Sequence, residues 1–160
     1  MLSSKVIVLL LSIATFTSGV AMRAPSSSKS TVEDAFAQSN NLIRCWERDD
    51  ESNPLSTHSL SEPVYELCSY KVSSLGYEKF YVSGLDMSSD DYTHVLALHK
   101  GTFQHYAVLN VCIQEAFPWK QHDGSSYTNL RCFCKRNGCN APRSFISFLD
   151  FNKMPMPEVL

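Results

Sequence analysis

From residue 42 onward, β-branched and aromatic residues alternate with polar residues in short runs that end at turn residues. A period of two is typical of β-strands with one buried face. The pattern predicts an all-β fold whose strands are Leu42–Glu47, Val64–Val72, Tyr77–Ser83, Tyr92–His99, Thr102–Gln114 and Tyr127–Cys134.

The most distinct hairpin in this pattern joins Tyr92–His99 to Thr102–Val111. Lys100 and Gly101 lie between these runs, and glycine readily adopts the positive φ of a two-residue hairpin turn. His105 then lies within a strand, where a sheet hydrogen bond accounts for it. Further turns are expected at Asn53-Pro54, Asp123-Gly124 and Asn137-Gly138.

The N-terminal residues 1–21 have the pattern of a secretory signal peptide. Lys5 precedes an apolar stretch, and the small residues Gly19 and Ala21 lie three and one positions before the expected cleavage site. The strongly apolar run, residues 6–11, is too short to span a bilayer. The mature protein is therefore expected to be secreted.

The next segment, residues 22–41, is rich in serine and contains one aromatic residue. Such a segment buries too little apolar surface to offset its ordering entropy, so a flexible leader is expected. Within it, Thr31 could cap a short helical turn that runs to Ala37.

Composition and charge narrow the class of protein. The chain has 160 residues, of which 44% are hydrophobic and 19% charged, as in an ordinary folded domain. Its 14 lysines and arginines against 16 acidic residues give a formal charge of −2. This balance gives no general attraction to nucleic acid or anionic lipid, so neither is expected as a partner.

Six cysteines follow the signal peptide, and in an oxidising compartment an even number of thiols predicts three disulfides. Spacing alone leaves many pairings open, although Cys132 and Cys134 are too close to bridge each other within a strand. A zinc site at 132–139 is the alternative. This segment lacks the paired Cys-x-x-Cys motifs of structural zinc modules, so neither a metal nor another cofactor is expected.

The segment Arg131-Cys-Phe-Cys-Lys-Arg-Asn-Gly-Cys-Asn140 resembles the closing signature of the three-finger superfamily, which includes snake-toxin-like, lymphocyte-antigen-like and activin-receptor-ectodomain-like proteins. Cys134 and Cys139 enclose four residues, and Asn140 follows directly. The opening segment Leu42-Ile-Arg-Cys-Trp46 also looks like the first strand of that family. Together the two segments bracket residues 42–140 as a three-finger-like domain.

This resemblance implies a disulfide pairing and a structural role for Asn140, whose amide would tie the C-terminal loop to neighbouring backbone. Two features depart from the family: Phe133 separates cysteines that are usually adjacent, and 43 residues without a cysteine separate Cys68 from Cys112. The implied pairs are Cys45 with Cys68, Cys112 with Cys132, and Cys134 with Cys139.

Catalytic constellations are sparse. His122-Asp123 could be a histidine with its orienting carboxylate, and His99, Lys100 and His105 could form a set for phosphodiester cleavage. No Gly-x-Ser-x-Gly elbow occurs. A non-enzymatic protein is therefore expected, with a small secreted hydrolase as the alternative.

Binding residues are expected on loop tips, since a three-finger framework presents its contacts there. Trp119 and Lys120 form the strongest candidate, because tryptophan is enriched in interface hot spots, with packing of Trp119 back onto the domain as the alternative. Lys100, at the expected hairpin turn, is another. Four cations without an acidic neighbour could steer an acidic partner or simply be solvated surface: Arg131, Lys135, Arg136 and Arg143.

The last segment, residues 141–160, is expected to be a C-terminal tail. Its charges and prolines interrupt any apolar run long enough for a lipid-anchor signal, so no direct membrane anchor is expected. Phe145, Phe148 and Phe151 are expected to pack on the domain, with a docking segment for a partner as the alternative. The resemblance implies an extracellular ligand or modulator of a cell-surface receptor.

Overall fold

The protein is described by a computed structural model that covers residues 29–53, 55–72, 79–89, 91–101, 103, 105–118 and 126–157. Outside these residues lie the expected signal peptide and three candidate site residues, Trp119, Lys120 and His122. Along the chain the elements are α1 (Thr31–Gln38), β1 (Trp46–Arg48), β2 (His58–Leu60), β3 (Cys68–Val72), β4 (Phe80–Gly84), α2 (Thr93–Lys100), β5 (Asn110–Pro118), β6 (Ser126–Cys134) and α3 (Phe145–Phe151).

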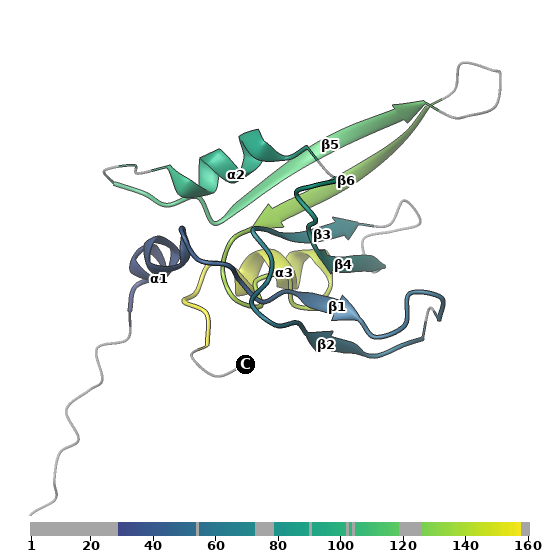
Figure 1. The fold of residues 1–160 in the computed structure, drawn as a ribbon, viewed down its shortest axis with the longest axis horizontal. Coiled ribbons are helices and arrows are strands. Elements are labelled where there is room, and N and C mark those ends of the chain that lie inside the picture. Colours follow the sequence, from purple (N-terminus) through teal and green to yellow (C-terminus); the bar gives the residue numbers. More distant parts are fainter. Residues whose placement is uncertain are drawn as a thin grey trace, which may run out of the picture.

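The strands form two antiparallel sheets (Figure 1). Strands β1 and β2 pair with each other, and the second sheet has the order β4-β3-β6-β5. The molecule is thus a small, disulfide-rich domain built mainly of antiparallel sheet, and the predicted fold class is confirmed. Strand β2 was not expected, and β1 is shorter than Leu42–Glu47 because Ile43 makes only an isolated bridge to Tyr65.

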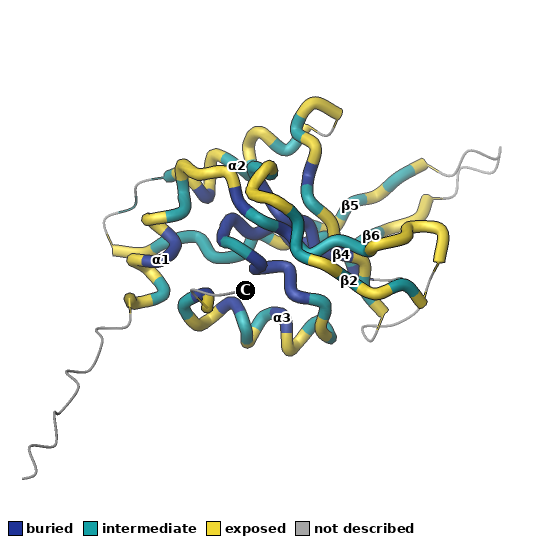
Figure 2. The backbone as a smooth tube through the Cα atoms, turned by 60° about the horizontal axis from the view of Figure 1, so that its bottom comes forward, coloured by how far each residue is buried: buried dark blue, intermediate teal, exposed yellow. Residues whose placement is uncertain are grey.

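The core lies on both faces of the four-stranded sheet, along the dark blue segments of Figure 2. On one face Tyr70 of β3 stacks on Phe148 of α3 with ring centroids 4.2 Å apart. On the other face Phe133 packs with Leu67 and with the half-buried Val95 of α2. The expected C-terminal tail is therefore partly a core element, and the prediction that its phenylalanines pack on the domain is confirmed.

The strand predicted at Tyr92–His99 is wrong, because this segment forms α2. Tyr92, Val95, Leu96 and His99 recur at helical spacing, and they face the sheet from one side of the helix. Gly101 has a φ of −63° rather than a positive φ, so Lys100 and Gly101 form no hairpin turn. The following strand accordingly starts at Asn110, well after Thr102.

The flexible leader is also corrected, because its second half forms α1. Ser30, rather than Thr31, is the N-cap. Its hydroxyl accepts a hydrogen bond from the Glu33 amide at 3.2 Å, and the Glu33 carboxylate accepts one from the Ser30 amide at 2.8 Å. This capping box begins a helix that buries Asp34 and Ala35 against the domain.

Candidate binding surface and its framework

Three disulfides hold the strand ends together. They join Cys45 to Cys68, Cys112 to Cys132, and Cys134 to Cys139, which is the pairing implied by the resemblance. Every cysteine except Cys112 is buried, with no solvent exposure. The first bridge joins the start of β1 to β3, the second joins β5 to β6, and the third joins the end of β6 to the loop that follows it.

Asn140 fills the gap between the two sheets. Its side-chain oxygen accepts a hydrogen bond from the Trp46 amide at 2.8 Å, and its amide nitrogen donates to the Trp46 carbonyl at 3.0 Å. The same nitrogen lies 3.2 Å from the carbonyls of Ser69 and Ser83. The buried amide thus connects β1 to β3 and β4, and it bonds to both backbone groups of Trp46 across the gap between the sheets.

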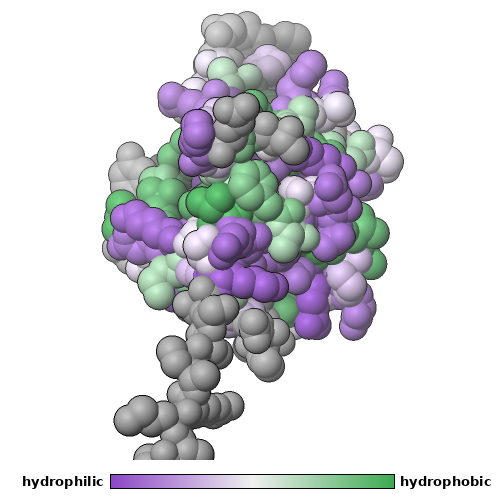
Figure 3. Space-filling model, turned by 90° about the vertical axis from the view of Figure 1, so that its left-hand side faces the viewer, coloured by the Kyte–Doolittle hydropathy of each residue, from purple (hydrophilic) through white to green (hydrophobic). Residues whose placement is uncertain are grey.

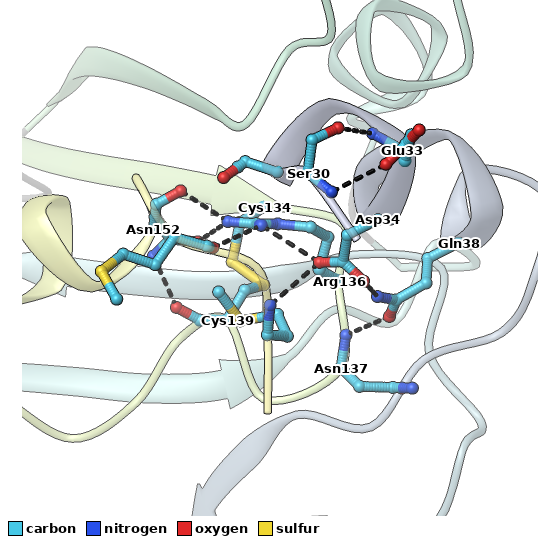
Figure 4. A network of polar contacts seen from close by, with 12 residues as sticks. Ser30, Glu33, Asp34, Gln38, Cys134, Arg136, Asn137, Cys139 and Asn152 are labelled. Carbon is cyan, nitrogen blue, oxygen red and sulfur yellow. Dashed lines mark hydrogen bonds and ion pairs between the residues drawn. A yellow bond between two sulfur atoms is a disulfide. The ribbon is translucent and has the colours of Figure 1, made fainter. Parts of the chain in front are cut away.

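Arg136 is the centre of a buried polar network (Figure 4). Its guanidinium lies 3.2 Å from the Asp34 carboxylate and donates to the carbonyls of Asn152, at 2.6 Å, and Met154, at 2.9 Å. Asp34 also accepts a hydrogen bond from the Met156 amide at 3.0 Å. Burial lowers the pKa of Arg136, and the charge of Asp34 counters this. The network joins α1, the loop after β6 and the segment after α3.

Lys135 is buried as well, so two of the four cations considered as solvated surface belong to the interior. Its ammonium donates to the carbonyls of Asn41, at 2.9 Å, and Glu66, at 2.8 Å. Lys100, expected at an exposed turn, is the last residue of α2 and pairs with the Glu66 carboxylate at 3.1 Å. These lysines therefore contribute to the packing of α2 and α1 rather than to a loop tip.

The β5–β6 hairpin is the most prominent surface feature (Figure 1). Among the described residues, β3 pairs with β6 from Leu130 to Cys134, and the outer half of the hairpin extends beyond this part of the sheet as a two-stranded ribbon. Near its outer end Phe117 and Tyr127 stack with ring centroids 5.3 Å apart, and Tyr127 is 43% exposed. The candidate residues Trp119 and Lys120 follow β5 in the sequence, outside the described part of the chain.

A polar cluster fixes the inner half of this ribbon to α2. Arg131 of β6 pairs with Glu115 of β5 at 3.3 Å, and its guanidinium lies 5.6 Å from the ring centre of Tyr92. The Tyr92 hydroxyl donates a hydrogen bond to Glu115. Since the Cys112–Cys132 bridge crosses the same two strands, the base of the ribbon is held by covalent and polar contacts while the aromatic pair projects.

Sequence reasoning missed Tyr127 as a surface residue, although a signal was present. Once Cys112 and Cys132 are paired across a regular hairpin, counting five residues outward on each strand places Phe117 opposite Tyr127. Aromatic pairs across two strands stabilise a ribbon and offer a large apolar area at low entropic cost. The ribbon end is therefore the candidate binding surface.

A groove of about 430 Å³ lies between β1 and β4 and is lined by Glu47, Arg48, Glu51, Tyr81, Val82 and Ser83. The Arg48 guanidinium and the Lys71 ammonium lie 5.4 and 5.7 Å from the Tyr81 ring centre. Glu47 accepts hydrogen bonds from Tyr65 and Gly84. With carboxylates and cations both present, the groove shows no preference for one sign of charge.

The helix α1 side of the molecule carries exposed apolar side chains among polar ones (Figure 3). Val32 and Phe36 lie one turn apart on α1 and are each 39% exposed. The same helix buries Asp34 on its inner side. Apolar and polar side chains are interspersed on the described part of this surface, so it does not identify a class of ligand.

Two histidines of the hydrolase alternative, His99 and His105, lie among the described residues, whereas His122 does not. His99 is buried, its Nδ1 lies 3.0 Å from the Val108 carbonyl, and burial lowers its pKa to about 4. His105 is exposed and lies in a bend before β5 rather than in the expected strand. Across the described ranges, no group of three or more histidine, cysteine or acidic side chains is arranged to hold a metal.

Comparison with known proteins places this sequence in a family. Residues 30–153 match the family of unknown function DUF5354. An uncharacterized protein of Caenorhabditis elegans, C02B8.3, is 49% identical over 128 residues, which cover 80% of this chain and 96% of the relative. No solved structure matches. Of the helices that the structure describes, none has the length and apolar character needed to cross a membrane.

Proposed function

Since the chain belongs to the family of unknown function DUF5354, we propose that its domain is a secreted, non-enzymatic binding module. The observation that carries the proposal is the β5–β6 ribbon, which is covalently held at its base and presents Phe117 and Tyr127 beyond the sheet. A rigid aromatic pair on a fixed framework is a common basis for protein recognition.

Secretion is supported by the cysteine chemistry. All six cysteines are paired in the structure, and such a set persists in oxidising compartments and is rare in the cytosol. Expression of the full chain with a C-terminal tag in cultured eukaryotic cells tests this directly. We expect the tagged protein in the medium with its N-terminus after Ala21 and no free thiols. Retention inside the cells with reduced cysteines would contradict the proposal.

The partner we propose is a cell-surface receptor, with the protein as its extracellular ligand or modulator. The resemblance to three-finger proteins supports this, as do the disulfide pairing and the position of Asn140. The three helices of the described residues are additions to a simple three-finger plan, and α2 occupies part of the long interval between Cys68 and Cys112. We therefore propose a divergent three-finger-like module whose contacts lie on the third hairpin.

Binding of the purified mature protein to an array of Caenorhabditis elegans cell-surface ectodomains tests the recognition role, since the relative comes from that organism. We expect saturable binding to at least one ectodomain. Tyr127→Ala should weaken it about 30-fold, the loss typical of an interface hot spot near 2 kcal/mol.

The matched control is Ile146→Ala on α3, because Ile146 is 65% exposed and lies on a different element. Its affinity should equal that of the unchanged protein. An array without saturable binding, or equal losses for both variants, would contradict the proposed surface.

A further inference from the structure

Strand β5 is an edge strand with an unbroken register. It pairs with β6 from Asn110 to Pro118 without a bulge, and its other side has no strand partner in the described sheet. Natural edges are usually protected by bulges, lysines, central prolines or short length. Here the only charged residue is Glu115, and the only proline is the last residue.

The register identifies which backbone groups point outward. The Cα atoms of Cys112 and Cys132 are 3.9 Å apart, the close spacing of a pair that exchanges no backbone hydrogen bonds. Pairs alternate along an antiparallel ladder, so the N–H and C=O groups of Cys112, Gln114 and Ala116 point away from β6. These three residues are exposed, whereas Ile113 and Glu115 between them are partly buried.

The opposite edge of the sheet is closed. The outward amide of Gly84 in β4 donates to the Glu47 carboxylate at 3.2 Å, and β1 lies alongside. Asn140 occupies the space between these strands and bonds to the Ser83 carbonyl. For the outward N–H and C=O groups of these three β5 residues, by contrast, no hydrogen bond is formed with any described residue.

We propose that the outer edge of β5 pairs with β5 of a second copy of this chain, in antiparallel register about a twofold axis at Gln114. The sequence of the strand is self-complementary in this register. Gln114 meets Gln114 of the second copy, Cys112 meets Ala116, and Ile113 meets Glu115, so no like charges oppose each other. Val111 meets Phe117, which places an apolar pair near each end.

Pairing in this way produces one continuous eight-stranded sheet from the two four-stranded sheets. It satisfies the outward backbone groups of Cys112, Gln114 and Ala116 in each copy. The stacked Phe117 and Tyr127 remain at the outer ends of the two ribbons, pointing to opposite ends of the dimer. The dimer would then present two copies of the proposed binding surface.

Sedimentation velocity of the disulfide-bonded mature protein over a concentration series tests the proposal. We expect a monomer–dimer equilibrium for the unchanged protein. Gln114→Lys and Gln114→Glu each place like charges opposite one another on the axis, so each should raise the dimer dissociation constant roughly tenfold. An equimolar mixture of the two variants should recover the dimer, because the opposed charges then attract.

Thr128→Lys is the matched control, since Thr128 is exposed in the same ribbon but lies on the inner strand β6, opposite Ala116. It should dimerise like the unchanged protein. Far-ultraviolet circular dichroism should show all four proteins equally folded. A monomer at every concentration would overturn the proposal, and so would a dimer that Gln114→Lys leaves intact or that Thr128→Lys weakens equally.

Discussion

The side chain of Asn140 acts where two sheets meet without a backbone ladder between them. It is fully buried and bonds to both the amide and the carbonyl of Trp46. Asn140→Ala would leave these buried groups unsatisfied, each at a cost of about 1–3 kcal/mol. We expect the free energy of unfolding, measured in guanidinium chloride with disulfides intact, to fall by about 3 kcal/mol in total.

Asn41→Ala serves as the comparison, because the Asn41 side chain donates one exposed hydrogen bond to the Ala37 carbonyl at 3.1 Å. Loss of an exposed bond of this kind should change the stability by less than about 0.5 kcal/mol. Equal losses in the free energy of unfolding for the two variants would contradict the proposed stabilising role of Asn140 between the sheets.

His99 makes stability depend on pH. Burial lowers its pKa from 6.5 to about 4. Below pH 6.5 the unfolded chain binds a proton that the folded chain does not, so this residue's contribution to stability is complete above pH 6.5 and is lost as the pH falls toward 4. The expected loss is about 3 kcal/mol, from 1.36 kcal/mol for each pKa unit.

Chemical unfolding at pH 7 and pH 4.5 measures this effect. His99→Asn retains a donor for the Val108 carbonyl and removes the titrating ring, so stability should fall less between the two pH values than in the unchanged protein. His105→Asn, at an exposed position, should leave the pH dependence as it was. An unchanged pH dependence in His99→Asn would contradict the assignment.

A buried charge pair, Asp34 with Arg136, is one of the contacts that hold helix α1 to the domain. Asp34→Ala would leave the Arg136 guanidinium buried without its counter-charge, and breaking a buried pair in this way costs about 3–5 kcal/mol. Amide hydrogen exchange should therefore accelerate in both α1 and residues 152–157, which share the network. Glu33→Ala, which removes only half of the capping box, should accelerate exchange in α1 alone.

At the level of elements, the sequence predicts strands with strong alternation and misses elements set by tertiary contacts. The β5–β6 ribbon follows from alternation and from Cys112 and Cys132. The sequence pattern predicts a strand where α2 forms, because a short apolar run fits the period of a strand as well as that of a helix. The apolar side of α2 packs with Phe133, and no local pattern indicates that this facing surface exists. The buried role of Arg136 depends on Asp34, 102 residues earlier, which no local pattern indicates.

For the molecule as a whole, the three disulfides differ in their access to solvent, and this predicts their order of reduction. Cys112 lies on the exposed edge of β5, whereas the other five cysteines have no solvent exposure. A small external thiolate can reach only the Cys112 sulfur without prior unfolding, since exchange requires direct attack on a disulfide sulfur. We expect limited dithiothreitol, followed by alkylation and peptide mass spectrometry, to label Cys112 and Cys132 first.

The Cys45–Cys68 and Cys134–Cys139 bridges should be reduced only at the rate of global unfolding, which a parallel unfolding experiment under the same conditions measures. Each bridge that closes about 20 residues contributes roughly 3 kcal/mol under the chain-entropy model. Loss of the Cys112–Cys132 bridge should therefore loosen the ribbon while the two buried bridges keep β1, β3 and the loop after β6 in place. Simultaneous labelling of all six cysteines would contradict this order and would mean that the ribbon and the core unfold as one unit.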